Sequence, residues 1–445
     1  MDALMKSVGD VACAIRDRVI AEVDDVEVVV ECSDRTSYAV ENDAIVATLE
    51  CGTWSVAMRA LKGGRVATAA TTSRDPAESA QALRRAIGAA QPDELGSFAT
   101  PEPVAGDVRR ADAGVWSLVD DPGALRAMAA AMRDGAWSQR PGVVVEGDVG
   151  AGRVRRALVT GRGGPVVSAE TSHTAFIMIE GNDWDARASR APITAHVADL
   201  GRALVASLPT REVTVEEFFG RPGEVSAVVH PRLLESLLRA LLLERVGLDR
   251  VLSGISRARV GDVVAPENFA LFDDTGAVAS LAGHASDDEG VAGARKALIE
   301  GGVLRTLLAD RRSAKRAGVG ATGNGFRAPI MAEDRAEAPV RVGMGHLEAR
   351  AGDVPRDALT TGRAVLLADL LGVHSANKST GAFNNPIMGG LALEDGVPVA
   401  RLKPGAWSAT GNFHELLKSL SGISRERLDT GSALLPWVAA RVHVA

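Results

Sequence analysis

The apolar pattern of the N-terminal part predicts a helix, several antiparallel strands and a second helix. Apolar residues recur every three or four positions along residues 4–23, as they do on one side of a helix. The segment VEVVVECS, residues 26–33, is rich in β-branched residues and predicts a buried strand. Further strand patterns follow, with turn signals at residues 41–43 and 63–64. A helical pattern returns over residues 76–90, so we predict an α+β layer rather than an alternating βαβ fold.

The same order of elements returns in the next part of the chain. An Asp-Pro pair introduces a helical pattern over residues 122–132, strand patterns fill residues 142–183, and a helix is predicted over residues 193–208. The composition then changes, which is typical of a domain boundary. We therefore predict two domains: residues 1–212, with layers of helices and antiparallel strands, and residues 220–445, which are rich in strand patterns.

A polar loop between two apolar segments is the most distinctive stretch of the second domain. Within residues 364–396, the apolar segments flank a loop that carries His374, Ser375 and Asn377. A cluster of such side chains between two buried segments is typical of a binding site. An ordinary loop that satisfies its own backbone hydrogen bonds would have the same pattern, and this alternative stays open.

Other polar, glycine-containing loops of the second domain carry further candidate residues. They are Asp287, Asp288, Glu289, Asn324, Arg327 and Asn412. We expect these loops to meet the His374 loop in one cavity that binds substrate. Arg327 is suited to hold a carboxylate, and the asparagines are suited to pair with peptide amides. The alternative is that the loops only hold the domain together.

Composition and charge narrow the class of partner. The chain has 445 residues and a formal net charge of −7, which argues against nonspecific binding to DNA or to an anionic membrane. No apolar run reaches the length that spans a membrane. The three cysteines, Cys13, Cys32 and Cys51, match neither a disulfide framework nor a metal motif, so we expect a protein of the reducing cytoplasm.

Local catalytic motifs are absent from the sequence. The His-Glu pair at His414-Glu415 has no second histidine at zincin spacing, and no cysteine follows Cys51. No G-x-S-x-G motif occurs, and side chains of neighbours such as His374 and Ser375 point apart on an extended segment. We expect no metal in this chain. A site assembled in space from dispersed histidines and carboxylates stays open.

Three segments of the second domain together resemble one protein family. They are residues 272–327, the loop sequence HSANKSTGAF of residues 374–383, and SATGNFHELLKSLSGIS of residues 408–424. In order and spacing they are similar to the TldD/PmbA family, once called modulators of DNA gyrase. The order of helices and strands in the first domain is similar to that family as well.

The resemblance implies a role in a two-subunit peptidase. One kind of family member, TldD, carries HExxxH on the helix that opens the C-terminal domain and a later cysteine, which together bind a metal. The other kind, TldE or PmbA, lacks these ligands and pairs with the first. Here the corresponding helix, residues 230–246, has no HExxxH, and the tail, residues 428–444, has no cysteine. The chain therefore resembles the TldE/PmbA subunit.

The resemblance to this subunit implies a heterodimer with a TldD-like metallopeptidase. The partner is expected to hold the metal, which is expected to be zinc. The pair acts on peptides or peptide-like small molecules, including those of biosynthetic pathways. Alone, the chain is expected to form a homodimer. Two alternatives remain: a free-standing hydrolase with its own non-zincin active site near His374 and residues 287–289, and a non-catalytic binding or assembly protein.

Overall fold

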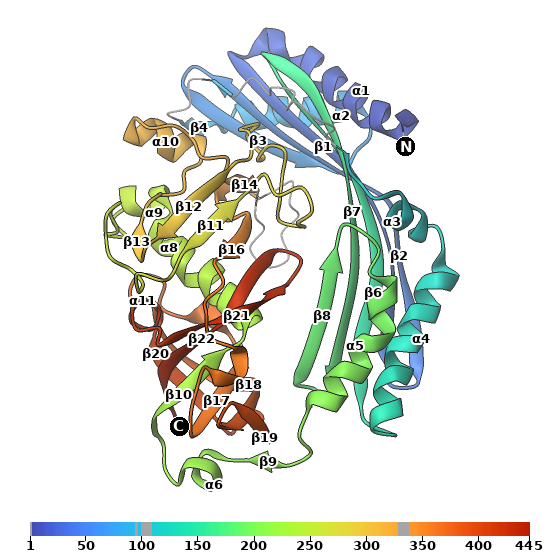
Figure 1. The fold of residues 1–445 in the computed structure, drawn as a ribbon. Coiled ribbons are helices and arrows are strands. Elements are labelled where there is room, and N and C mark those ends of the chain that lie inside the picture. The colour runs from blue at the N-terminus through green and yellow to red at the C-terminus, as the bar shows by residue number, and fades with distance from the viewer. Residues whose placement is uncertain (1, 94–96, 99–108, 328–337) are drawn as a thin grey trace.

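The chain forms two large β-sheets, each with its own hydrophobic core (Figure 1). The computed structural model describes residues 2–93, 97–98, 109–327 and 338–445. Runs of consecutive strands are separated by helices, which gives the predicted α+β fold with a strand-rich C-terminal half. No helix of the described residues is long and apolar enough to cross a membrane.

In the part of the chain that the structure describes, the N-terminal sheet has eight strands, most of them antiparallel. In sheet order they are β4 (Gln91–Pro92), β3 (Arg65–Thr71), β2 (Ala44–Lys62), β1 (Asp25–Glu41), β6 (Val145–Thr160), β7 (Gly163–Ile179) and β5 (Arg109–Arg110), and β8 (Asp183–Ser189) also pairs with β7. The predicted turns join these strands. Asn42 turns the first hairpin at a φ of 52°, a left-handed conformation that asparagine tolerates better than most residues.

The alternation of β1 explains what lies on each face of this sheet. Val26 and Val28 are buried in the core beneath the helices, while Glu27 and Val29 point to the other face. The helices are α1 (Asp2–Val19) with the 3-10 turn η1 (Ile20–Glu22), α2 (Pro76–Ile87), α3 (Ala113–Leu118), α4 (Pro122–Gln139) and α5 (Thr194–Ser207). Figure 1 shows α1 to α4 on one side of the sheet and the C-terminal domain on the other.

Capping residues fix where two of these helices begin. Asp75 accepts a hydrogen bond from the Ala77 amide at the start of α2, and Asp121 does the same for Ala124 at the start of α4. Each helix has proline at its first turn, as the Asp-Pro pair predicted for α4. The prediction ended α4 too early, because the helix continues to Gln139. Its glycine, Gly135, lies so close to α5 that a Cβ would be 2.5 Å from a backbone oxygen.

The C-terminal sheet has twelve strands among the described residues. In sheet order they are β13 (Val303–Leu304), β12 (Arg295–Glu300), β11 (Leu271–Asp274), β16 (His346–Ala349), β22 (Ala433–Val444), β10 (Gly223–Val229), β17 (Arg363–Leu370), β18 (Ala382–Glu394), β19 (Val397–Leu402) and β9 (Glu212–Val213). β20 (Ser408–Asn412) pairs with β18 and β22, and β21 (Gly422–Asp429) pairs with β22. β14 (Gly325–Arg327) and β15 (Val340–Val342) form a separate pair.

A buried helix runs through the core of this domain. It follows β10 directly and consists of α7 (Pro231–Leu237), a π-helical turn η2 (Leu238–Leu242) and α8 (Leu243–Val246). Most of its leucines lie in the hydrophobic core of this domain, as is typical of a strongly apolar helix. The short helices that remain are α6 (Val215–Phe219), α9 (Leu248–Leu252), α10 (Arg311–Ala317), α11 (Phe413–Lys418) and the 3-10 turns η3 (Arg356–Ala358) and η4 (Val373–Ser375).

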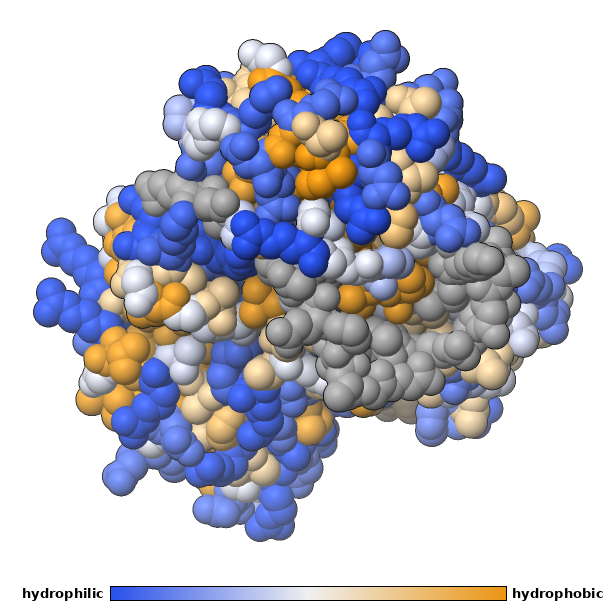
Figure 2. Space-filling model, turned by 90° about the horizontal axis from the view of Figure 1, so that it is seen from above, coloured by the Kyte–Doolittle hydropathy of each residue, from blue (hydrophilic) through white to orange (hydrophobic). Residues whose placement is uncertain are grey.

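The face seen from above carries mostly polar and charged residues. Figure 2 shows apolar residues there only in separate groups among them. All three cysteines are free thiols.

Candidate functional site

The helix that opens the C-terminal domain meets the tail of the chain at Glu235. This carboxylate accepts hydrogen bonds from the hydroxyls of Thr430, at 2.6 Å, and Ser432, at 2.7 Å. Arg239, one turn further along the helix, pairs with it at 2.8 Å. Burial raises the pKa of the Glu235 carboxyl, but the Arg239 charge and the hydroxyl hydrogen bonds outweigh this and hold the pKa below its usual value. We call these four residues the helix–tail junction.

Arg239 ties three parts of the chain together at this junction. Besides pairing with Glu235, its guanidinium donates to the carbonyl oxygens of Met344, Gly345 and Ser432 at 3.0 to 3.2 Å. All of these acceptors lie in loops next to β16 and β22. The guanidinium therefore places one positive charge among a carboxylate and three carbonyl dipoles.

The helix–tail junction does not fit a transition metal. Zinc sites in proteins combine cysteine, histidine and carboxylate ligands, usually three or four of them. The junction offers one carboxylate, Glu235, and its charge is already balanced by Arg239. Elsewhere in the described part of the chain, no three His, Cys, Asp or Glu side chains gather in a way that could hold a metal ion.

A second cluster joins the N-terminal sheet to the C-terminal domain through buried ion pairs. Glu27 on β1 is fully buried and receives two hydrogen bonds of 2.8 Å from Arg59 on β2. Arg327 on β14 also reaches Glu27, at 3.3 Å, and Arg59 reaches Glu289 at 3.4 Å. The Arg59 and Arg327 charges hold the pKa of Glu27 below its usual value, although burial alone raises it. These four residues form what we call the interlayer cluster.

The acidic loop beside this cluster uses its side chains to organise backbone. Asp287 accepts from the amides of Glu289, Val291 and Gly325 at 2.8 to 2.9 Å. Burial, together with the nearby charge of Glu289, raises the pKa of Asp287 to about 7. Asp288 accepts from the Arg327 amide at 2.6 Å and pairs with Arg156 of β6.

Asn324 has a similar structural role. Its amide nitrogen donates to Asp273 at 3.2 Å and to the Gly343 carbonyl at 2.9 Å, while its oxygen accepts from the Thr322 hydroxyl. The side chain is fully buried. Because both polar atoms of its side chain already have partners inside the protein, Asn324 acts in holding these segments together.

The predicted site residues form two groups rather than one. Asp287, Asp288, Glu289, Asn324 and Arg327 lie together, and a cavity of about 250 Å³ there is lined by Arg59, Glu289 and Arg327 among others. Asn412 lines a different hollow, which shares no lining residue with this cavity, and His374, Ser375 and Asn377 line neither of the two. A single cavity was expected because all of these loops are polar and contain glycine, but such a pattern carries no information on which loops meet.

The loop that carries His374, Ser375 and Asn377 is exposed. The Asn377 side chain accepts from the amides of Ser379 and Thr380 at 3.0 to 3.1 Å, so this part of the loop satisfies its own backbone. Ser375 donates to the Gly372 carbonyl. These contacts agree with the alternative of an ordinary loop.

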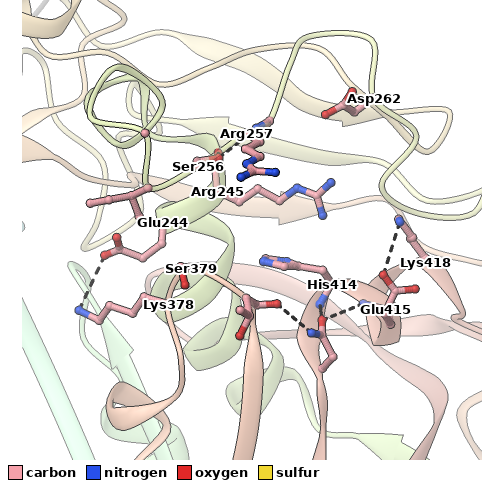
Figure 3. Close-up of a pocket in the computed structure, with 15 residues that line it drawn as sticks. Glu244, Arg245, Ser256, Arg257, Asp262, Lys378, Ser379, His414, Glu415 and Lys418 are labelled. Carbon is pink, nitrogen blue, oxygen red and sulfur yellow. Dashed lines mark hydrogen bonds and ion pairs between the residues drawn. The ribbon is translucent and has the colours of Figure 1, made fainter.

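Asn412 begins α11 and lines an open pocket of about 540 Å³ (Figure 3). Its side-chain oxygen accepts from the amides of His414 and Glu415, and its nitrogen donates to the Thr380 carbonyl at 2.8 Å. Asn412 thus holds the turn at residues 377–381 against the start of α11.

Comparison with known proteins identifies the family to which this chain belongs. Residues 222–445 match the family profile described as the PmbA/TldA metallopeptidase C-terminal domain. The chain belongs to the TldD/PmbA family.

Curated relatives and solved structures agree with this assignment. A metalloprotease of Methanothermobacter thermautotrophicus is 27% identical over 214 residues, which cover 47% of this chain and 45% of the relative. A metalloprotease of Archaeoglobus fulgidus is 33% identical over 104 residues, which cover 23% of this chain and 24% of the relative. The chain thus spans less than half the length of the curated relatives that it matches.

Two solved structures share the fold over nearly the whole chain. TldE from Thermococcus kodakarensis superposes with a TM-score of 0.84 at 21% identity, covering 98% of this chain and 99% of that one. A protein of Bacteroides thetaiotaomicron described as a modulator of DNA gyrase gives 0.79 at 19% identity, covering 98% of each chain.

The sequence analysis did not identify the charged residues that hold this TldD/PmbA-family fold together. Glu235 and Arg239 lie four residues apart among the leucines of the helix of residues 231–246. Glu27 likewise interrupts a run of valines. A charge inside a segment that must be buried needs a partner, and this signal was available in both segments.

Two histidines, the fully buried His173 and the half-buried His230, are expected to make the TldD/PmbA-family chain sensitive to acid. Burial lowers the pKa of His173 to about 4 and that of His230 to about 3. His230 lines a cavity of about 340 Å³ between β8, α5 and the C-terminal sheet. Because the unfolded chain takes up these protons near pH 6.5, folding stability is complete above that pH and is lost as pH falls toward 4.

We expect each of these two histidines to lower the unfolding free energy by about 1.4 kcal/mol for each pH unit that the pH falls between 6.5 and the pKa of the folded state. His230 accepts from the Arg232 amide at the start of α7, and asparagine can replace this cap. Melting temperatures of His230→Asn from pH 7 to 4.5 should therefore fall less steeply than those of the native protein. The exposed His196→Asn serves as control, and equal slopes for all three proteins would contradict the prediction.

Proposed function

We propose that this chain is the non-metal subunit, of the TldE/PmbA kind, in a heterodimeric metallopeptidase that acts on peptides or peptide-like small molecules. The observation that carries this is the helix–tail junction. In the metal-binding kind of subunit, the helix and the tail supply the ligands. Here the same two elements meet through Glu235, Arg239 and two hydroxyls.

The charges at this junction explain how the fold can do without an ion. A metal site holds carboxylate and imidazole groups together because the cation offsets their mutual repulsion and desolvation. In this chain the Arg239 guanidinium supplies the positive charge and satisfies three carbonyls as well. The catalytic metal, expected to be zinc, would then belong to a TldD-like partner.

A free sheet edge offers a surface for pairing with that partner. Along residues 44–55, β2 pairs with β1 on one side, whereas β3 joins only from Val56 onward. No described strand covers the other side of this segment. Val46 is 48% exposed there and Leu49 is 60% exposed. An apolar strand with unpaired backbone groups readily adds a strand from another chain.

The corresponding experiment measures pairing and hydrolysis together. The chain is co-expressed with a TldD-like subunit, and the mass of the complex and the cleavage of a peptide mixture are recorded. We expect cleavage only from the pair, and a homodimer when the chain is alone. Changing Val46 and Leu49 to lysine should weaken both assemblies at least about tenfold, because charges at a sheet edge oppose strand addition.

Val397→Lys is the matched control, since Val397 is 57% exposed but lies on β19. Hydrolysis by the isolated chain that survives a chelator would favour a free-standing hydrolase instead. A stable complex without any hydrolysis would favour a binding or assembly protein.

A further inference from the structure

The open pocket of Figure 3 has an excess of positive charge. Its lining includes four cations, Arg245, Arg257, Lys378 and Lys418, and three acids, which are Glu244, Asp262 and Glu415. Lys378 lies 3.8 Å from Glu244, and Lys418 lies 3.5 Å from Glu415. Asp262 is then the one acid of the lining left for two guanidinium groups.

Arg245 is the residue that this imbalance affects most. It extends from α8, is partly buried, and makes no side-chain hydrogen bond or ion pair with the described residues. Burial lowers the pKa of Arg245, and the charges of Asp262 and Glu415 only partly compensate. In Figure 3 its side chain crosses the pocket between Arg257 and His414. A partly buried guanidinium without a partner is stabilised when it binds a negatively charged acceptor.

His414 completes the wall opposite the arginines. Its Nδ1 is buried and has no hydrogen-bond partner in the described part of the chain. Burial and the Arg245 charge lower the pKa of His414 to about 4, so the ring is neutral at pH 7 and adds no positive charge. The ring packs on Gly381, where a Cβ would come within 2.7 Å of it, and this brings the turn of Ser379 and Thr380 to the rim.

We propose that this pocket binds a small molecule or peptide end through an oxyanion, a carboxylate or a phosphate, held by Arg245 and Arg257. The volume of about 540 Å³ is that of a drug-sized ligand rather than of a bare ion. Planar guanidinium groups match both kinds of oxyanion with two hydrogen bonds each. Ser379 and Thr380 also line the pocket, and their hydroxyls are available to the rest of the ligand.

The pocket is separate from the helix–tail junction. Arg245 lies ten residues after Glu235 on one continuous helix, which corresponds to about 15 Å. The inference therefore does not rest on the proposed peptidase role. A ligand in this pocket would contact α8, the turn at residues 377–381 and α11.

Calorimetric titration of the full chain tests the proposal with defined probes at pH 7 and about 0.15 M salt. The probes are inorganic phosphate, pyrophosphate, and one short peptide with either a free or an amidated C-terminus. We expect either the phosphate probes or the free-acid peptide to bind, and the amidated peptide to bind at least about tenfold more weakly than the free acid if the ligand is a carboxylate.

Variants locate the binding. Arg245→Gln and Arg257→Gln should each weaken the bound probe at least about tenfold. Arg259→Gln, an exposed arginine of the same segment outside the lining, should not. Because Arg257 is exposed, its variant keeps the test valid even if Arg245→Gln fails to fold. Absence of binding by every probe, or equal binding by all variants, would overturn the proposal.

Discussion

Replacing Glu27 with glutamine is expected to lower the unfolding free energy by about 3 to 5 kcal/mol at pH 7. Glu27 is fully buried, and its carboxylate accepts two hydrogen bonds from Arg59 and lies 3.3 Å from Arg327. The glutamine variant keeps the shape but leaves the buried Arg59 guanidinium with the more distant Glu289 as its remaining acid in the interlayer cluster. The removal of one member of a buried pair leaves an uncompensated charge, which is the costly outcome.

Urea unfolding of the native protein and of Glu27→Gln measures this effect. Glu41→Gln on the same strand is the control, because Glu41 is exposed. The pKa of Glu27 is lowered in the folded state, so its contribution is present above the unfolded pKa and is lost on acidification. The difference between wild type and variant should therefore shrink below about pH 4.5. A loss under about 1 kcal/mol at pH 7 would mean that the cluster contributes little to stability.

Replacing Arg239 with methionine has the second large expected effect. The change leaves the mostly buried Glu235 without a cation and leaves three carbonyls without their donor. Because Arg239 is 30% exposed and water can partly replace it, we expect a loss of about 2 to 3 kcal/mol rather than the full penalty of a buried pair.

A double-mutant cycle separates the pair from its surroundings. The unfolding free energies of Glu235→Gln, Arg239→Met, the double variant and the native protein are compared. We expect a coupling energy of at least about 1 kcal/mol between the two residues. Arg221→Met, at an exposed position, controls for the substitution itself. Additive effects of the two changes would show that Glu235 and Arg239 do not stabilise each other.

Local signals in the sequence predicted much of this fold. The proline and aspartate at the starts of α2 and α4, and the turns at Asn42 and after Lys62, act through neighbours in the chain. The α+β class followed from the order of such elements.

Contacts between distant segments could not be predicted in the same way. Glu27 and Arg327 are separated by 300 positions, and nothing local to either indicates the other. The same holds for the loops of Asp287 and Asn377, which have similar compositions but lie at different hollows. The roles of Asn377 and Asn324 in holding backbone depended on partners that only the folded chain brings together.

Metal content tests the central claim most directly. The chain is purified alone and in complex with a TldD-like subunit, and transition metals are measured by elemental analysis after extensive dialysis. The account predicts well under one equivalent of metal in the isolated chain and about one equivalent per heterodimer, lost when the partner's HExxxH histidines are changed. One tightly held ion per isolated chain would contradict it, because Glu235 and Arg239 already balance each other's charge at the helix–tail junction.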